Sequence, residues 1–235
     1  MKTIFHPAAS RGHADHGWLR SYHSFSFAGY YNPERMGFGL LRVLNDDRVS
    51  GGMGFGRHPH DNMEIISIPL SGALKHKDSM GNESVIKTDE VQIMSAGTGV
   101  EHSEFNYSKT EEVNFLQLWI FPEKDDITPR YEQKYFDPER RLNKWQTVVA
   151  PDGKDAIWIN QNAYLNRVRL DAGQSIEYHL HGLQQGAYLF LLDGHISLNG
   201  TELHTRDAAG IWETGTFEIK SNSSSELLLI EVPMS

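Results

Sequence analysis

Two short strings in the sequence place four metal-ligating side chains in two pairs. His58 and His60 lie in GRHPHDNME, and His102 and Glu104 lie in GVEHSEFN. In an extended strand, the side chains of residues i and i+2 point to the same face. Two such strands facing each other across a barrel would bring three imidazoles and one carboxylate around one point. This donor set, which lacks a thiolate, is typical of a divalent transition metal.

Most of the chain consists of short apolar runs that are separated by turn-forming residues. Four such runs lie in the first half, at residues 37–47, 62–82, 90–99 and 113–123. Runs of about 4–8 residues that are rich in aliphatic and aromatic side chains, with Gly or Asn turns between them, are typical of antiparallel strands. Helical periodicity is scarce. The pattern therefore predicts an all-β fold, either a sandwich or a barrel.

A charged stretch with several prolines interrupts this pattern over residues 122–145. We expect it to be a connector that contains a short helical turn, with Asp137 as the cap and Pro138 as the first residue. Strand-like segments resume after it. The sequence thus predicts an N-terminal metal-binding domain over residues 1–138 and a C-terminal domain over residues 139–235.

A weak internal repeat indicates that the two domains are of the same kind. Each half has a glycine, a histidine six residues later and a second histidine two residues after that: Gly52, His58 and His60 in the first half, and Gly173, His179 and His181 in the second. A period of this length is typical of duplicated domains. No second His-x-Glu pair follows, so we expect the C-terminal domain to be degenerate and without metal. His179 and His181 are then surface residues or a remnant of the duplication.

The composition excludes several classes of function. The chain has no cysteine, which rules out disulfides, thiolate metal sites and cysteine nucleophiles. A net charge of −9 without a Lys/Arg block argues against direct binding of nucleic acid. No apolar run approaches the roughly 18 residues of a transmembrane helix, and the N-terminus lacks the apolar stretch of a secretory signal. We expect a cytoplasmic protein without a membrane segment.

The histidine motifs resemble those of a known family. The Gly52 to His60 spacing resembles the first cupin motif, and His102 followed by Asn106 resembles the second. The strings RGHADHGW, SFSFAGYYNP, GRHPHDNMEIISIPLSG, HKDSMGN, QIMSAGTGVEHSEFN and LQLWI together resemble the pirin family, close to bacterial pirins with quercetinase-type activity. They cover most of residues 10–120, and the resemblance is looser beyond about residue 140.

The resemblance implies two tandem cupin domains, each a jelly-roll β-barrel, in one chain (a bicupin). It implies one divalent metal held by His58, His60, His102 and Glu104, with Fe(II) as the first choice and Ni, Co, Mn, Cu or Zn as alternatives. It also implies a quercetin 2,3-dioxygenase-type reaction, in which O2 opens a flavonol and carbon monoxide is released. Eukaryotic members are also described as transcriptional cofactors that work through protein partners.

Two carboxylates compete for the role of ligand and general base. Glu64 lies near the place where general cupins take their carboxylate, and strict alternation puts residues 58, 60, 62 and 64 on one face. Glu104 is tied to His102 at i+2, and the family resemblance favours it. We expect Glu104 to be the ligand and the first candidate for the base. Glu64 is the second candidate for the base, or a hydrogen-bond acceptor that orients a histidine ring.

Other side chains could line a pocket for a planar aromatic ligand. The apolar candidates are Phe38, Met53, Phe55, Met63 and Phe115, although an ordinary core position is the preferred interpretation for each. Gln117 could reach the pocket as a polar contact. His13, His16, His23 and His76 could lie at its mouth or behind the ligands, but we expect surface or structural positions for them.

The leading hypothesis is therefore a metal-dependent dioxygenase acting on a small aromatic substrate and O2. One alternative is a regulatory metal-binding protein that works through a protein partner without turnover. Another is a different metal-dependent cupin enzyme, such as an isomerase, for which a pocket rich in Arg and Lys would be expected. A monomer is plausible, because two fused barrels already bury each other's faces.

Overall fold

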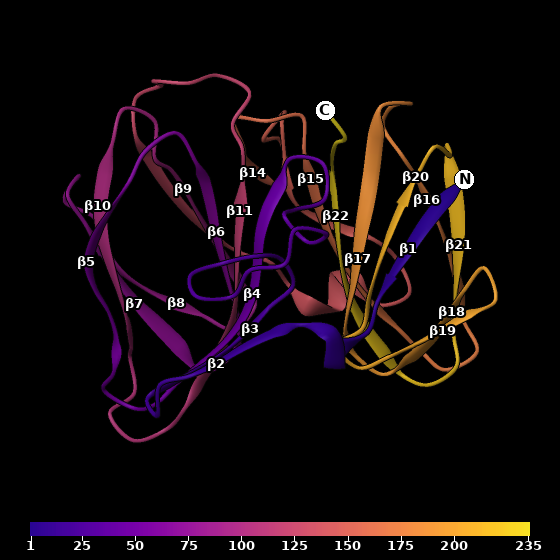
Figure 1. The fold of residues 1–235 in the computed structure, drawn as a ribbon, viewed down its shortest axis with the longest axis horizontal. Helices are drawn as coiled ribbons and strands as arrows, with labels where there is room; N and C mark the ends of the chain where they lie inside the picture. Colours follow the sequence, from indigo (N-terminus) through magenta and orange to yellow (C-terminus); the bar gives the residue numbers. More distant parts are fainter.

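The chain forms two β-barrels side by side, each made of a seven-stranded and a four-stranded sheet (Figure 1). The computed structural model describes all 235 residues. It contains 22 strands, and its only helices are two short 3-10 turns. The predicted all-β fold with two tandem barrels is confirmed. Neither of the two helical turns has the length and apolar character needed to cross a membrane.

The first barrel carries the sequence pairs singled out above. Its seven-stranded sheet has the order β12-β9-β6-β11-β4-β3-β2, and its four-stranded sheet has the order β5-β10-β7-β8. The strands are β2 (Gly12–Asp15), β3 (Leu19–His23), β4 (Leu41–Val49), β5 (Gly54–His60), β6 (Glu64–Ser71), β7 (Ala73–Asp78), β8 (Glu83–Lys87), β9 (Glu90–Ser95), β10 (Val100–Asn106), β11 (Val113–Ile120) and β12 (Arg130–Tyr135).

The second barrel repeats this architecture. Its sheets have the orders β1-β20-β17-β22-β15-β13-β14 and β16-β21-β18-β19. The strands are β1 (Lys2–His6), β13 (Gln146–Ala150), β14 (Ile157–Trp158), β15 (Tyr164–Leu170), β16 (Ser175–His179), β17 (Gln185–Asp193), β18 (His195–Leu198), β19 (Thr201–His204), β20 (Ala208–Trp212), β21 (Thr216–Ser221) and β22 (Ser225–Pro233).

The two ends of the chain and the connector deviate from a simple division by sequence. β1 pairs with β20, so the first strand of the chain completes the sheet of the second barrel. Part of the predicted connector is a strand, because β12 pairs with β9 along the edge of the first barrel. The predicted helical turn is confirmed as a 3-10 turn over Pro138–Arg141, in which the Asp137 carboxylate accepts a hydrogen bond from the Glu139 amide at 3.0 Å.

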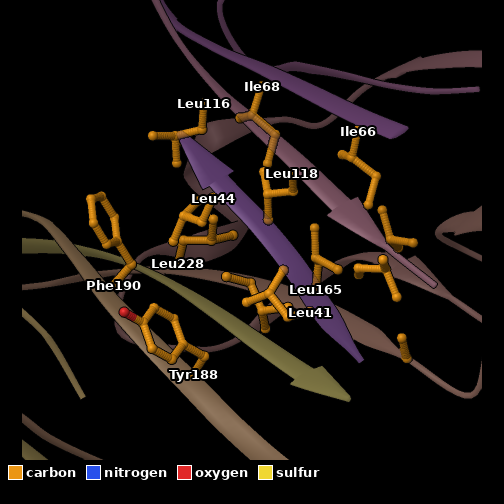
Figure 2. Close-up of a cluster of buried hydrophobic side chains, with 14 of the residues drawn as sticks. Leu41, Leu44, Ile66, Ile68, Leu116, Leu118, Leu165, Tyr188, Phe190 and Leu228 are labelled. Atoms are coloured by element: carbon orange, nitrogen blue, oxygen red, sulfur yellow. The ribbon is translucent and has the colours of Figure 1, made fainter. Parts of the chain in front are cut away.

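The largest apolar core lies between the barrels, where the two seven-stranded sheets face each other (Figure 2). Leu116 and Leu118 of β11 and Ile66 of β6 contribute from the first barrel, and Phe190 and Leu228 contribute from the second. The neighbouring positions on β11 turn the other way, into the first barrel. A strand buried on both faces carries an almost unbroken apolar run, which accounts for the sequence VNFLQLWI.

The interiors of the two barrels differ. A cluster of 15 buried apolar residues fills the second barrel, with members such as Leu189, Phe217 and Leu229. The first barrel has smaller apolar clusters at its ends and polar side chains between them. The first barrel is therefore the one that offers room for a ligand.

Candidate metal centre

Three histidines converge on the inner face of the four-stranded sheet. His58 and His60 lie on β5 and His102 lies on β10, directly opposite His58 in the antiparallel register. The ring centroids are 4.8 Å apart for His58 and His60, 4.5 Å for His58 and His102, and 4.9 Å for His60 and His102. One nitrogen from each ring lies within 4.8 Å of the others. The three predicted histidines thus lie together, whereas Glu104 belongs to a second group with His76 and His102.

The way in which the pairs meet differs from the expectation. β5 and β10 are hydrogen-bonded neighbours in one sheet, and do not face each other across the barrel. Neighbouring strands lie about 4.8 Å apart, which matches the spacing of the three imidazole rings. An irregularity in the β5–β10 register between His102 and Glu104 then shifts the partner of Glu104 to Phe55.

His60 and His102 are in the protonation state that a metal requires. Burial, together with the neighbouring imidazoles, lowers the pKa of His60 to about 4 and the pKa of His102 to about 3. Both rings are therefore neutral near pH 7, and each offers a lone pair. The Nδ1 atom of His58 lies 2.8 Å from the Gly56 carbonyl. A carbonyl can only accept, so this Nδ1 carries the proton and Nε2 is free to bind a metal.

The protein alone leaves some of the imidazole nitrogens incompletely paired. Nε2 of His60 lies 3.0 Å from Nε2 of His102, and at most one of these two neutral nitrogens can donate a hydrogen to the other. Nδ1 of His102 is buried and has no hydrogen-bond partner. Nitrogen and carboxylate donors without a thiolate suit a divalent transition metal. The residues present therefore fit such a metal.

Glu104 reaches the site from β10 and is held by two neighbours. One carboxylate oxygen accepts a hydrogen bond from the Ser67 hydroxyl at 2.9 Å, and the other accepts one from the Gln117 amide at 2.6 Å. Glu104 groups with His76 and His102 within 4.8 Å, so His102 is shared by two overlapping sets of candidate ligands. The four predicted ligands lie in one region, with Glu104 turned toward the barrel interior.

Glu64 lies elsewhere. Its carboxylate accepts hydrogen bonds from the Ser95 hydroxyl at 2.9 Å and from the Asn160 amide of the second half of the chain at 3.3 Å. Asn62, in the turn between β5 and β6, has a φ of 40°, which breaks the alternation that would have put Glu64 on the face of His60. Burial raises the pKa of Glu64. It belongs neither to a group of candidate ligands nor to the lining of the cavity beside them.

A cavity of about 480 Å³ opens beside the histidines. Its wall includes His58, His60 and Glu104, and Gln117 reaches it as predicted. The large apolar side chains in its lining are Trp18, Leu19, Phe27, Phe55 and Trp119. Of the apolar candidates from the sequence, Phe55 alone lines it. Phe38 and Phe115 are core residues, Met63 packs on a small core cluster, and Met53 is exposed.

Of the remaining histidines, His23 and His76 occupy the less favoured alternative, beside the cavity or behind the ligands, whereas His16 is exposed as expected. His16 and His23 line the cavity, and His76 is fully buried with its ring centroid 5.4 Å from that of His102. Nε2 of His76 lies 3.3 Å from the Asp78 carboxylate, and its ring stacks on Tyr131. His76 and Asp78 lie two residues apart on one strand, which indicates that both point into the barrel. The lysines beside them made the segment resemble an exposed one. His13, which stacks on Tyr22, is exposed as predicted.

The histidine pair of the second barrel forms no comparable centre. His179 is exposed, with Nε2 3.1 Å from the Glu177 carboxylate. His181 stacks on Tyr164, and its Nδ1 lies 2.9 Å from the buried carboxylate of Glu231. Neither histidine belongs to a group of candidate metal ligands. Both histidines are exposed, as expected for surface residues.

Comparisons with known proteins agree with this geometry. Family models match at residues 5–120, described as Pirin, and at residues 147–232, described as the quercetinase C-terminal cupin domain. The chain is 44% identical over 228 residues to the quercetin 2,3-dioxygenase of Escherichia coli K12, which covers 96% of each protein. It is 38% identical over 227 residues to a pirin-like protein of Caulobacter vibrioides, covering 96% of this chain and 97% of that one.

A solved structure extends the likeness to the whole fold. The bacterial pirin YhhW from Escherichia coli, determined in complex with nickel(II), superposes with a TM-score of 0.94 at 41% identity, and the match covers 100% of both chains. The match therefore includes both barrels. Together with the two family models, these relatives show that this chain belongs to the pirin family, with a second barrel of the cupin type.

Proposed function

We propose that the protein is a metal-dependent dioxygenase that opens a flavonol such as quercetin with O2. The observation that carries this proposal is a cavity with aromatic walls that is lined by His58, His60 and Glu104, with His102 beside them. The names of the relatives support it, since one of them is called a quercetin 2,3-dioxygenase. The cavity contains no lysine or arginine, so it favours a neutral aromatic ligand over the small anionic substrate of an isomerase-type cupin.

The proposed reaction consumes one flavonol and one O2. Two carbon–carbon bonds of the central ring break, the carbon that carried the 3-hydroxyl leaves as carbon monoxide, and both atoms of O2 enter the remaining ester product. A divalent metal held by His58, His60, His102 and Glu104, with Fe(II) as our first choice, would supply Lewis acidity for the deprotonated flavonol oxygen.

We assign to Glu104 the role of taking the proton from the 3-hydroxyl. Its two oxygens point in fixed directions because Ser67 and Gln117 each donate a hydrogen bond to one of them. A base held in this way needs no reorganisation when the proton moves. Glu64 bonds to Ser95 and Asn160 outside the cavity, so it has no part in the proposed proton transfer.

The walls would hold the flat ring system and exclude water. Trp119 packs edge-on against Phe27 with centroids 5.3 Å apart, and Trp18 packs edge-on against Phe55 at 5.5 Å. His60 packs edge-on against Trp119 at 5.0 Å, which places an aromatic wall directly beside a candidate ligand. Exclusion of water protects reactive species from hydrolysis and strengthens the electrostatic interactions within the site.

The experiment is anaerobic reconstitution with Fe(II) and, separately, with Ni, Co, Mn, Cu and Zn, followed by addition of quercetin and O2. We expect metal-dependent loss of flavonol absorbance, with one O2 consumed and one carbon monoxide released for each flavonol. Stoichiometric metal binding without turnover under any metal would contradict the dioxygenase and favour a regulatory protein that acts through a partner.

Replacing Gln117 with alanine should reduce kcat without abolishing metal binding. The change removes the 2.6 Å hydrogen bond to Glu104, and a hydrogen bond to a charged group contributes about 1.5–3 kcal/mol. The expected loss in kcat is roughly 10–100-fold. Steady-state kinetics and metal analysis on the same preparation measure both quantities. Gln133→Ala, on β12 outside the cavity, is the control, and an unchanged kcat in Gln117→Ala would refute the assigned role.

A further inference from the structure

One wall of the cavity is polar and takes no part in the chemistry described so far. It consists of Ser21 and His23 on β3 and of Asn45 and Asp47 on β4, all of which line the cavity. The antiparallel register places Ser21 opposite Asp47 and His23 opposite Asn45. All four side chains are buried, with Asp47 and His23 each 3% exposed.

Strand alternation separates this wall from a neighbouring ion-pair network. Asp46, between Asn45 and Asp47, points to the opposite face and pairs with Arg11 and Arg206. Asp47 faces the cavity and has no cationic partner, because no lysine or arginine lines it. Two adjacent aspartates therefore have different roles: Asp46 pairs with fixed arginines, and Asp47 faces the space that a ligand would occupy.

The polar wall keeps two hydrogen-bond acceptors without a protein partner. The Ser21 hydroxyl donates to one oxygen of Asp47, and no side chain or backbone amide donates to the other oxygen. Nδ1 of His23 lies 2.9 Å from the Asn45 side-chain carbonyl, which can only accept. Nδ1 therefore carries the proton in the neutral ring, and Nε2 is left as an acceptor. Asp47 and His23 both line the cavity, so these acceptors are available to a ligand that brings hydrogen-bond donors.

The charge state of the wall suits neutral hydroxyl groups. Burial raises the pKa of Asp47 to about 7. The hydrogen bond from Ser21 lowers this pKa, whereas the charges of Asp46 and Glu104 raise it further. Burial lowers the pKa of His23, so that its ring is neutral. A carboxylate or phosphate group on a ligand would find no positive charge here. A phenolic hydroxyl, which can donate to a carboxylate oxygen or to an imidazole nitrogen, is the matching group.

We propose that Ser21, His23, Asn45 and Asp47 form a second, metal-independent recognition subsite, which accepts hydrogen bonds from ring hydroxyls of the ligand other than the metal-binding one. This inference rests on the proposal that the ligand is a flavonol, and it adds that the protein discriminates among flavonols. The subsite selects polyhydroxylated flavonols over a flavonol whose only hydroxyl is the one directed at the metal.

The test is equilibrium binding to the metal-free full-length protein, measured by calorimetry with two ligands. Quercetin carries hydroxyls on both outer ring systems, whereas 3-hydroxyflavone carries only the metal-directed hydroxyl. We expect Asp47→Asn to weaken quercetin binding by roughly 10-fold or more, as the loss of a charge-assisted hydrogen bond implies, and to change 3-hydroxyflavone binding by less than about 2-fold.

A second variant and a matched control distinguish loss of the subsite from misfolding. His23→Phe keeps a ring that can pack on Phe27 while removing Nε2, and it should also reduce the preference for quercetin. Glu64→Gln is the control, because Glu64 is likewise a buried carboxylate bonded to a serine, but it lies outside the cavity. It should leave the ratio of the two dissociation constants unchanged.

The outcomes separate this subsite from the dioxygenase proposal. An unchanged ratio in both Asp47→Asn and His23→Phe overturns the subsite, and so does failure of both flavonols to bind the metal-free wild-type protein. A reduced ratio in both variants, with the control unchanged, supports it. If that reduction occurs in a protein that shows no turnover with any metal, the subsite stands and the dioxygenase proposal fails.

Discussion

Replacing His102 with alanine is expected to abolish stoichiometric metal binding and, with it, turnover. His102 is 1% exposed and belongs to both overlapping groups of candidate ligands, so its removal leaves neither group complete. Removing a group that merely orients a ligand costs about 10–100-fold in metal affinity. Removing a ligand itself should cost more than that.

Elemental analysis after reconstitution and desalting measures this effect directly, independently of the reaction. The matched control is His179→Ala, because His179 also begins a His-x-His pair but is exposed in the second barrel. It should retain one metal per chain. If His102→Ala retained one tightly bound metal per chain, the site would have to lie elsewhere.

The candidate ligands could be paired from the sequence because strand geometry is local. Alternation with a period of two puts His58 with His60, and His102 with Glu104, wherever the two strands lie. The same rule failed for Glu64, because a single residue with positive φ, Asn62, separates it from His60. A rule based on alternation holds within a strand and ends at the turn.

The polar wall could not be predicted in this way, because its members meet only through strand pairing. Ser21 and Asp47 are 26 residues apart in the chain, and His23 and Asn45 are 22 apart. Leu19–His23 pairs with β4 across residues 24–40, so no local turn pattern specifies this partner. For the same reason, nothing in the first residues indicated that β1 pairs with β20 of the second barrel.

The arrangement of the cores connects the two barrels energetically. The second barrel contributes no candidate metal ligand, yet its sheet supplies half of the largest apolar cluster, against the outer face of β11 and β6. The inner face of β11 carries Gln117, which holds Glu104, and the inner face of β6 carries Ser67, which holds the same carboxylate. The second barrel therefore supports the strands that position the proposed base.

Replacing Leu228 with alanine should consequently destabilise both barrels, including the one that does not contain it. Leu228 is 1% exposed on β22 and lies in the core between the barrels, near Leu44 and Phe190 (Figure 2). Truncation of a buried leucine costs about 2–5 kcal/mol, from lost transfer free energy and from the cavity that remains. Urea denaturation followed by circular dichroism gives the change in the free energy of unfolding.

Hydrogen exchange with peptide resolution then shows where the loss is felt. Because the core is shared, peptides from β6 and β11 should lose protection together with peptides from β15 and β22. Leu183→Ala, the same chemical change at a side chain that is 89% exposed, should alter stability by less than about 0.5 kcal/mol. Loss of protection confined to the second barrel would show that the barrels unfold independently, and that the second barrel does not support the metal-binding strands.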